Sequence, residues 1–183
     1  MDAAVYVLLA LAALAIAWVI VTLNGFVRAR NQVDESWSGV DVQLKRRHDL
    51  VPNLVETVKG YAAHERGVLE EVTKARAAAV AATDSEQQGK AEATLTSALG
   101  GIRAVAEQYP QLRASENFQQ LQAELAQIED QIQAARRIYN SNVRAFNTRI
   151  QVFPNSLLAS AYQPRQFFQI EDAAERAVPA VAF

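Results

Sequence analysis

The chain has 183 residues, a formal net charge of −2 at pH 7 and no cysteine. About 160 residues follow an apolar N-terminal run, enough for one domain of ordinary size. Without cysteine the chain forms no disulfide and offers no thiolate as a metal ligand or nucleophile. The nearly neutral charge gives no general attraction to nucleic acid, so we expect no nucleic-acid partner.

An uncharged apolar run extends from Ala3 to Leu23. At about 1.5 Å per residue, a helix of this length reaches roughly 31 Å, close to the hydrocarbon thickness of a bilayer. A cleaved secretory signal is the alternative, but it needs a basic region before the run, and only Met1 and Asp2 stand there. We therefore predict a retained transmembrane anchor at residues 1–25, with the lipid bilayer as a partner.

The charges around this run predict an orientation. Basic residues lie on its C-terminal side, at Arg28, Arg30, Lys45, Arg46 and Arg47, whereas Asp2 lies on the other side. An excess of Lys and Arg marks the cytoplasmic side of a membrane protein. We expect a single-pass protein with its N-terminus outside and its C-terminal domain in the cytoplasm.

The segment after the anchor has the pattern of an amphipathic helix. Its apolar positions recur mostly at steps of three and four, with a seven-residue step across Arg47 and His48: Val33, Trp37, Val40, Leu44, Val51, Leu54, Val58, Tyr61, Leu69 and Val72. This pattern predicts one helix of coiled-coil character, about 50 residues long, that grows out of the anchor. Pro52 removes the amide that would bond the carbonyl of His48, so we expect a kink there.

Two charged residues, Arg47 and Glu65, fall on the apolar side of this predicted helix at 100° per residue. A charge in that position is paired, lies at the edge of the apolar stripe with its head in water, or faces an oligomer partner. A catalytic role for Glu65 is disfavoured, because no second acid or base accompanies it at a matching spacing.

A second helix is predicted to begin near Thr83, which forms a capping-box pattern with Glu86. Pro110 ends this helix. Its core positions are Ala91, Leu95, Ala98, Ile102, Val105 and Tyr109.

A third helix is predicted from Ser115 to Phe153, and its apolar stripe is the most regular in the chain: Phe118, Leu121, Leu125, Ile128, Ile132, Ala135, Tyr139, Val143, Phe146, Ile150 and Phe153. Arg136, Asn140 and Asn147 line one flank of the stripe. They form either an interhelical hydrogen-bond ladder that fixes the register or an ordinary polar boundary.

Pro154 closes the third helix, and a short helix is predicted from Asn155. Residues 164–183 are too apolar for an inert disordered tail, so we expect them to dock on the bundle or on a neighbour. The predicted fold class is therefore all-α. An N-terminal transmembrane helix continues into a bundle of long antiparallel helices at residues 26–163, with three long helices and a short C-terminal one.

Three separated segments carry a family resemblance: RRHDLVPNLVETVKGYAAHE from Arg46, YPQLRASENFQQLQAEL from Tyr109 and ARRIYNSNVRAFNTRIQVFP from Ala135. In their order and spacing they resemble the signature segments of the LemA family. The resemblance implies a bacterial single-pass protein of the inner membrane whose soluble part is an all-α bundle of long antiparallel helices. Pro179 and Phe183 resemble a family ending.

The residues of these segments lead to two structural hypotheses. Asn117, at the start of the third helix, is expected to bond the carbonyl that Pro52 leaves free. Asn53 points away from the apolar stripe, as do Glu56 and Lys59, and is expected to contact another subunit. The same role in contacts between copies is expected of Trp37, Glu65 and the tail that ends at Phe183.

A search for catalytic chemistry finds little. His48 and His64 would lie on opposite faces of one helix, too far apart to share a metal ion. The sequence has no second histidine for a zinc-protease motif, no Glu-x-x-His pair, no glycine-rich phosphate loop and no nucleophile elbow. We therefore predict that the protein is not an enzyme and has no cofactor and no metal site.

Three functions from different classes remain open. The first is a membrane-anchored scaffold that self-associates into a homo-oligomer and organises the membrane. The second is an adaptor that recruits a protease or a signalling protein without assembling itself. The third is a ligand-binding or metal-binding bundle. The long apolar stripe and the apolar tail favour the scaffold.

Overall fold

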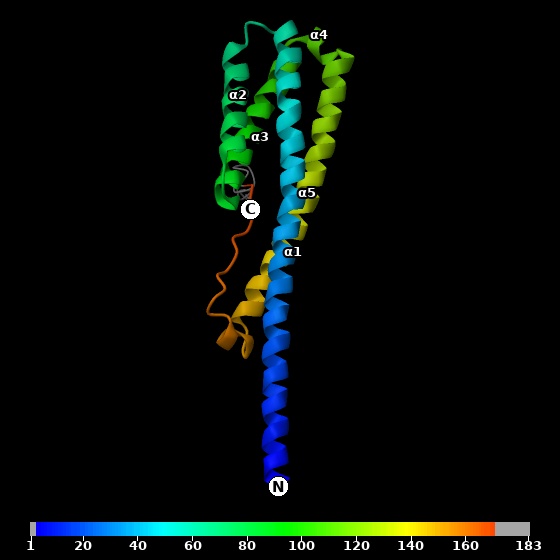
Figure 1. The fold of residues 1–183 in the computed structure, drawn as a ribbon. Coiled ribbons are helices and arrows are strands. Elements are labelled where there is room, and N and C mark those ends of the chain that lie inside the picture. Colours follow the sequence, from blue (N-terminus) through cyan, green and yellow to red (C-terminus); the bar gives the residue numbers. More distant parts are fainter. Residues whose placement is uncertain (1–2, 171–183) are drawn as a thin grey trace, which may run out of the picture.

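The computed structural model describes residues 3–170, which form five α-helices and one 3₁₀ helix and contain no strand (Figure 1). The elements are α1 (Ala3–Tyr61), α2 (Arg66–Ala81), α3 (Ser85–Gln108), α4 (Pro110–Arg113), α5 (Glu116–Gln151) and η1 (Asn155–Leu158). This architecture confirms the predicted all-α class, in which an apolar N-terminal helix continues into a bundle.

α1 runs through the whole length of the molecule and is 59 residues long (Figure 1). α5 packs along it in the opposite direction, while α2 and α3 form a hairpin whose α2 side packs on the C-terminal part of α1. The N-terminal part of α1 extends beyond the bundle. α1 continues through Pro52 without ending, because packing on both sides of the proline keeps the helix in place.

The single helix predicted from Val33 to Val72 is wrong, because the chain forms two helices there. α1 ends at Tyr61, and the turn is closed by hydrogen bonds from Ala62 N to Val58 O (2.8 Å) and from Glu65 N to Ala62 O (3.0 Å). An eight-residue step in the apolar pattern, from Tyr61 to Leu69, coincides with this turn. If α1 continued straight to Val72, its last residues would extend past the start of α5. The apolar stripe on those residues would then have no helix to pack on and would lie in water. The described bundle therefore has four longer helices instead of three.

The core consists of two clusters that follow one another along α1. The cluster farther from the N-terminus joins α1, α2, α3 and the start of α5, and includes Leu54, Val72, Leu95, Ile102 and Phe118. The cluster nearer the N-terminus joins α1, α5 and the chain after η1, and includes Phe26, Val40, Ile132, Phe146 and Phe168. Phe168 is fully buried, so the described end of the chain belongs to the core.

The start of α3 differs from the prediction by one residue. Asp84, not Thr83, is the N-cap, and its Oδ1 accepts hydrogen bonds from the amides of Glu86 (3.0 Å) and Gln87 (2.8 Å). A carboxylate satisfies two orphan amides here and complements the positive end of the helix dipole. The predicted core positions Leu95, Ala98, Ile102 and Val105 are all buried, and α3 ends at Gln108, two residues before Pro110.

α5 spans Glu116–Gln151, close to the predicted limits of Ser115 and Phe153. Phe153 was expected in the apolar stripe, but it lies beyond the helix and is 81% exposed. The rest of the stripe is buried or partly buried against α1. Regular steps therefore identified the buried face of α5 but not its last residue.

Candidate functional site

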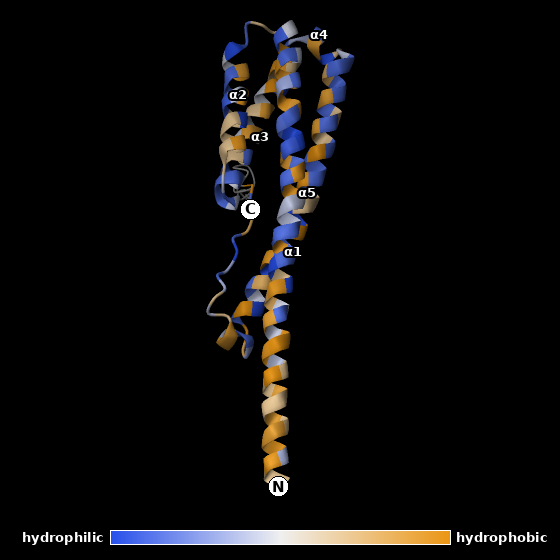
Figure 2. Ribbon diagram, in the orientation of Figure 1, coloured by the Kyte–Doolittle hydropathy of each residue, from blue (hydrophilic) through white to orange (hydrophobic). Residues whose placement is uncertain are grey.

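The N-terminal part of α1 is the only helix among residues 3–170 that is long and apolar enough to cross a membrane. Figure 2 shows it as an almost continuous apolar cylinder that projects from a mixed bundle. Its 18-residue apolar window has no residue buried inside the protein. Such a surface is stable only in lipid or against other helices, as expected for the predicted anchor.

α5 is fixed to α1 just beyond this apolar run. Arg149 Nη1 donates a hydrogen bond to the carbonyl of Gly25 (2.8 Å), and Asn142 Nδ2 donates to the carbonyl of Gln32 (3.4 Å). A Cβ at Gly25 would lie 3.0 Å from Arg149 Nη1, so the glycine permits this close approach. The two contacts are seven residues apart on each helix, as antiparallel packing requires.

The C-terminal segment, residues 164–170, lies along α5 and is held by paired side-chain bonds. Asn147 Nδ2 donates to Arg165 O (2.9 Å), and Arg165 N donates back to Asn147 Oδ1 (2.8 Å). Asn140 and Phe168 make the same two-way pair, with both bonds at 2.9 Å. Each asparagine thus satisfies both backbone groups of one residue.

The predicted hydrogen-bond ladder therefore exists, but its partner is the C-terminal segment and not another helix. Arg136 Nη1 extends it to the carbonyl of Ile170 (3.5 Å). The register follows from geometry. Seven helical residues from Asn140 to Asn147 rise about 10.5 Å, and three extended residues from Arg165 to Phe168 span about 10 Å.

Other contacts hold the C-terminal segment against α1 and α3. Trp37 packs on Tyr139 and Phe168 with ring centroids 5.1 and 5.4 Å apart, respectively. On α3, a Cβ at Gly89 would lie 2.1 Å from the carbonyl oxygen of Gln169, so only glycine fits there. Trp37 is thus packed within one chain, where the sequence analysis expected a contact between copies.

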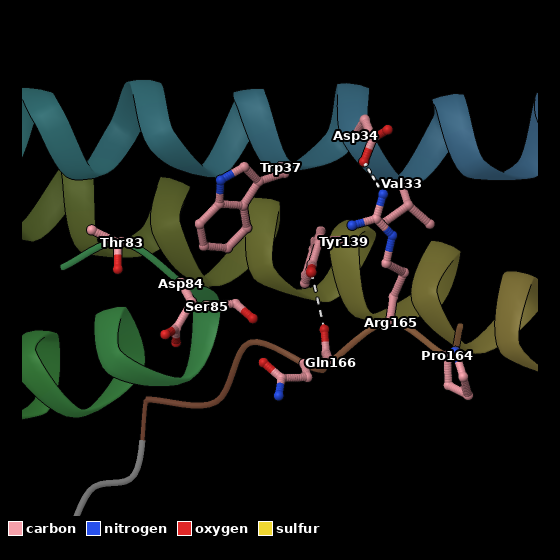
Figure 3. A pocket seen from close by; sticks show the side chains of 10 residues that line it. All are labelled: Val33, Asp34, Trp37, Thr83, Asp84, Ser85, Tyr139, Pro164, Arg165 and Gln166. Carbon is pink, nitrogen blue, oxygen red and sulfur yellow. Dashed lines mark hydrogen bonds and ion pairs between the residues drawn. The ribbon is translucent and has the colours of Figure 1, made fainter. Parts of the chain in front are cut away.

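A cavity of about 430 Å³ opens between α1, the start of α3, α5 and the C-terminal segment (Figure 3). At its rim Arg165 Nη2 bonds Asp34 Oδ1 (2.9 Å), and on its wall Tyr139 OH donates to Gln166 O (3.0 Å). Burial raises the pKa of Tyr139 above its usual value of 10.0. The polar lining is suited to holding water or a polar group, and it has no cluster of metal-binding side chains.

A buried ionic cluster lies deeper in the bundle, and only its Arg47 was predicted from the sequence to need a partner. Glu92 of α3 is fully buried and accepts hydrogen bonds from His48 Nε2 (2.6 Å), Gln88 Nε2 (2.9 Å) and Arg47 Nη1 (3.3 Å). Arg47 also donates to Thr96 Oγ1 (2.7 Å) and lies 3.3 Å from Glu129 of α5. The cluster joins α1, α3 and α5, and within it the charges of Arg47 and Glu92 are paired with each other.

The cluster resolves the alternatives left open for Arg47, which is paired within the chain. The cluster occupies the seven-residue step in the apolar stripe of α1, and its signals in the sequence were that step and the place of Arg47 on the apolar side of the helix. Nothing in the local pattern marked Glu92, which lies in an alanine-rich stretch. The two histidines do not lie on one helix, as was expected. His48 is buried in α1, and His64 lies in the exposed turn between α1 and α2.

The carbonyl that Pro52 leaves free has a partner, but not the predicted one. Arg76 Nε of α2 donates to His48 O at 2.7 Å. The prediction that Asn117 fills this role is wrong, because the unpredicted α2 packs beside the proline instead. Asn117 and Asn53 are both exposed.

Glu65 lies in the turn before α2 and accepts a hydrogen bond from the hydroxyl of Tyr109 (3.0 Å). This bond to a carboxylate, together with burial, raises the pKa of Tyr109 above 10.0. Glu65 is therefore paired across the end of the bundle. Phe183, the remaining predicted site residue, lies outside the described residues.

An apolar helix long enough to cross a membrane, joined to an all-α bundle, is typical of a membrane-associated helical protein. The chain belongs to the LemA family, whose profile matches residues 36–183. It is 28% identical over 138 residues to Protein LemA of Metamycoplasma hominis, a match that covers 74% of this chain and 63% of that relative.

Two further relatives are named magnetosome proteins. The chain is 24% identical over 188 residues to Magnetosome protein MamQ 2 of Paramagnetospirillum magneticum, covering 87% of this chain and 69% of the relative. It is 25% identical over 185 residues to Magnetosome protein MamQ of Magnetospirillum gryphiswaldense, a match that covers 85% of this chain and 68% of that relative. Neither the family name nor the names of these relatives denotes an enzyme.

Proposed function

We propose that this protein is a non-enzymatic membrane scaffold whose copies associate through their membrane-spanning helices. The observation that carries the proposal is a face of small residues on α1, where Ala10, Ala13 and Ala17 recur at steps of three and four and are exposed in the single chain. Helices in lipid associate through small side chains, which let their backbones approach closely.

The position of the alanine face allows copies to pack without collision of their bundles. Thr22 is buried beneath the bundle, which marks the side of α1 that the bundle covers. At 100° per residue, Ala13 lies about 180° from Thr22, and Ala10 and Ala17 lie about 120° and 140° away. Neighbouring spans therefore meet back to back with their bundles outward.

A groove at the far end of the bundle provides a separate contact, with a copy other than the one that packs on the alanine face. It has a volume of about 580 Å³ between α1 and α2, with Val55, Ala63 and Leu69 among its lining residues. Its rim carries both signs of charge, at Glu56, Glu70, Lys59, Arg66 and Lys74. A surface that carries both signs is suited to pairing with a second copy of itself.

We further propose a bacterial inner-membrane location with the bundle in the cytoplasm. The fold brings five arginines to the end of the bundle nearest the membrane: Arg28, Arg30, Arg144, Arg149 and Arg165. Only Asp34 and Glu35 oppose them in the adjoining stretches of α1, α5 and the chain after η1. Positive charge next to a span supports a cytoplasmic location.

Cysteine crosslinking of the full-length protein in membranes tests self-association, since the native chain has no cysteine. We expect Ala13→Cys to form an oxidised dimer, because the alanine faces meet. Leu11→Cys is the matched control, as it lies about 160° from Ala13 on the same helix. Equal crosslinking at both positions, or none at Ala13→Cys, would contradict the proposal.

The adaptor is the second candidate, and the groove between α1 and α2 favours it. An open groove with an apolar floor and a charged rim accepts an amphipathic helix from another protein as readily as it accepts a second copy. Absence of crosslinks, together with a monomeric protein in detergent, would favour the adaptor over the scaffold.

A further inference from the structure

The loop that follows α5 lies at the level of the membrane-spanning run. Arg149, in the last turn of α5, bonds the carbonyl of Gly25, two residues past the end of the run at Leu23. Because α5 runs antiparallel to α1, the chain after Arg149 continues toward the membrane. Two residues further on, at about 1.5 Å each, α5 ends at Gln151, level with the region of Leu23, and the loop with Phe153 follows directly.

Burial along α1 gives independent evidence for the same level. Thr22 is only 9% exposed and Trp18 and Val19 are partly buried, whereas residues 3–17 are exposed. The bundle therefore covers α1 as far as Trp18, five residues inside the apolar run. At about 1.5 Å per residue this is roughly 7.5 Å below its end, a depth typical of side chains at the interface of a bilayer.

The loop exposes large apolar side chains at this level. Phe153 is 81% exposed, Leu157 69% and Val152 43%, although each would favour an apolar environment. No charged residue occurs between Arg149 and Arg165. Figure 2 shows apolar residues at η1 beside the apolar part of α1.

The backbone of the loop is suited to a poorly hydrated environment. Hydrogen bonds within the chain satisfy the amides of Ser156, which bonds Val152 O (2.9 Å), and of Leu157, which bonds Pro154 O (3.1 Å), and just after the loop Ala159 N bonds Ser156 O (3.3 Å). Pro154 has no amide to satisfy. Unpaired backbone groups are costly near hydrocarbon, so this internal pairing removes an obstacle to insertion.

We propose that residues 152–158 form an insertion loop, which places the side chains of Phe153 and Leu157 in the leaflet from which α1 emerges. The occupant of this apolar surface is the phospholipid of that leaflet at the boundary of headgroups and acyl chains. Arg28, Arg144 and Arg149 lie at the level of the headgroup phosphates. The inference rests on α1 crossing the bilayer, as in the proposed function. The insertion loop gives the bundle a second attachment point, which fixes the orientation of the bundle to the membrane.

Depth-dependent quenching tests the insertion loop on the full-length protein. Single-cysteine variants Phe153→Cys and Leu157→Cys are labelled with a polarity-sensitive fluorophore and reconstituted in vesicles of phosphatidylcholine and phosphatidylglycerol. Leu9→Cys in the span is the positive control, and Asn117→Cys at the opposite end of the bundle is the negative control. With a nitroxide lipid whose quencher lies near the headgroups, we expect the labels at both loop positions to be quenched, because the loop lies at that depth, and the Asn117→Cys label to stay unquenched.

Two results would overturn the inference, and they differ from each other. Labels at both loop positions that stay unquenched while Leu9→Cys is quenched by a nitroxide deep in the acyl chains would show that α1 spans the bilayer and that the loop stays in water. An unquenched label at Leu9→Cys would show that α1 does not cross the bilayer, which removes both the loop insertion and the membrane scaffold.

Discussion

Asn140 and Phe168 are joined by two hydrogen bonds in opposite directions, each 2.9 Å long, between one side-chain amide and both backbone groups of the phenylalanine. The pair fixes Phe168 in the core, next to Trp37 of α1. An extended segment thereby becomes part of a helical bundle without any strand to pair with. The end of the bundle next to the apolar part of α1 therefore depends on a few polar side chains of α5.

Replacing Asn140 by alanine is expected to release the C-terminal segment. Two partly buried backbone groups would lose their partners, at a cost of about 1–3 kcal/mol. Urea unfolding of the full chain in detergent measures this cost, and hydrogen exchange at the amide of Phe168 reports the local release. Asn142→Ala is the control, because the hydrogen bond from Asn142 to the carbonyl of Gln32 is long (3.4 Å) and exposed. Equal effects of the two substitutions would contradict the assigned role.

Gly89→Ala is expected to destabilise the protein, because the added Cβ would lie 2.1 Å from the carbonyl oxygen of Gln169. The C-terminal segment must then move away from α3. Gly100→Ala is the matched control, since a Cβ there meets nothing within 4 Å. In a helix interior that change should stabilise by about 0.5–1 kcal/mol. Thermal melts of both variants provide the comparison, and a shift of the same sign in both would contradict the prediction.

Glu92→Ala is expected to cost about 3–5 kcal/mol, because it leaves the buried guanidinium of Arg47 without its carboxylate partner on α3. Glu86→Ala removes an exposed carboxylate from an ion pair with Lys90 on the same helix and should cost less than about 1 kcal/mol. Chemical denaturation of both variants gives the two values. A cost below 1 kcal/mol for Glu92→Ala would show that the cluster contributes little to stability.

Arg76 and Pro52 are expected to be energetically coupled. Arg76→Ala removes the donor to the carbonyl of His48, which should cost about 1–3 kcal/mol. In a Pro52→Ala background the backbone amide of residue 52 becomes able to bond that carbonyl, so the same Arg76→Ala change should cost less. A double-mutant cycle on unfolding free energies measures the difference. Additive effects would exclude the coupling.

Tyr109 is expected to make stability fall at high pH. Its hydrogen bond to the Glu65 carboxylate raises its pKa above 10.0, so the folded protein holds this proton more tightly than the unfolded chain does. The stabilisation is complete below pH 10 and is lost as the pH rises through the higher folded pKa. Unfolding curves at pH 9 to 11 test this, with Tyr109→Phe as the reference. An unchanged pH slope in that variant would contradict the prediction.

How much of the fold was predictable depends on the range of the interactions. The buried face of α5, from Phe118 to Ile150, follows from local steps of three and four, and the structure confirms it. The turn at Ala62–Glu65 was missed because one continuous helix was predicted across the eight-residue step from Tyr61 to Leu69, and the turn depends on where α5 begins. Local periodicity predicts which face of a helix is buried. It does not predict where the helix that packs on this face begins or ends.

The polar contacts were predictable only in part. The flanking positions of Asn140 and Asn147 identified a hydrogen-bond ladder, but its partner is an extended segment 18 to 28 residues away along the chain. Arg47 was recognised as a charge that needs pairing, whereas Glu92 had no signal, because a single buried carboxylate leaves no periodic pattern. Such partners follow from the packing of helices and not from sequence spacing.

The mass of the full-length protein in mild detergent tests the proposed scaffold most directly. Light scattering gives the mass of protein without its detergent, and negative-stain images of the same sample give its symmetry. The account predicts a defined multiple of the chain mass of 20.1 kDa and particles of one symmetry. A uniform monomer of 20.1 kDa would contradict self-association through the alanine face.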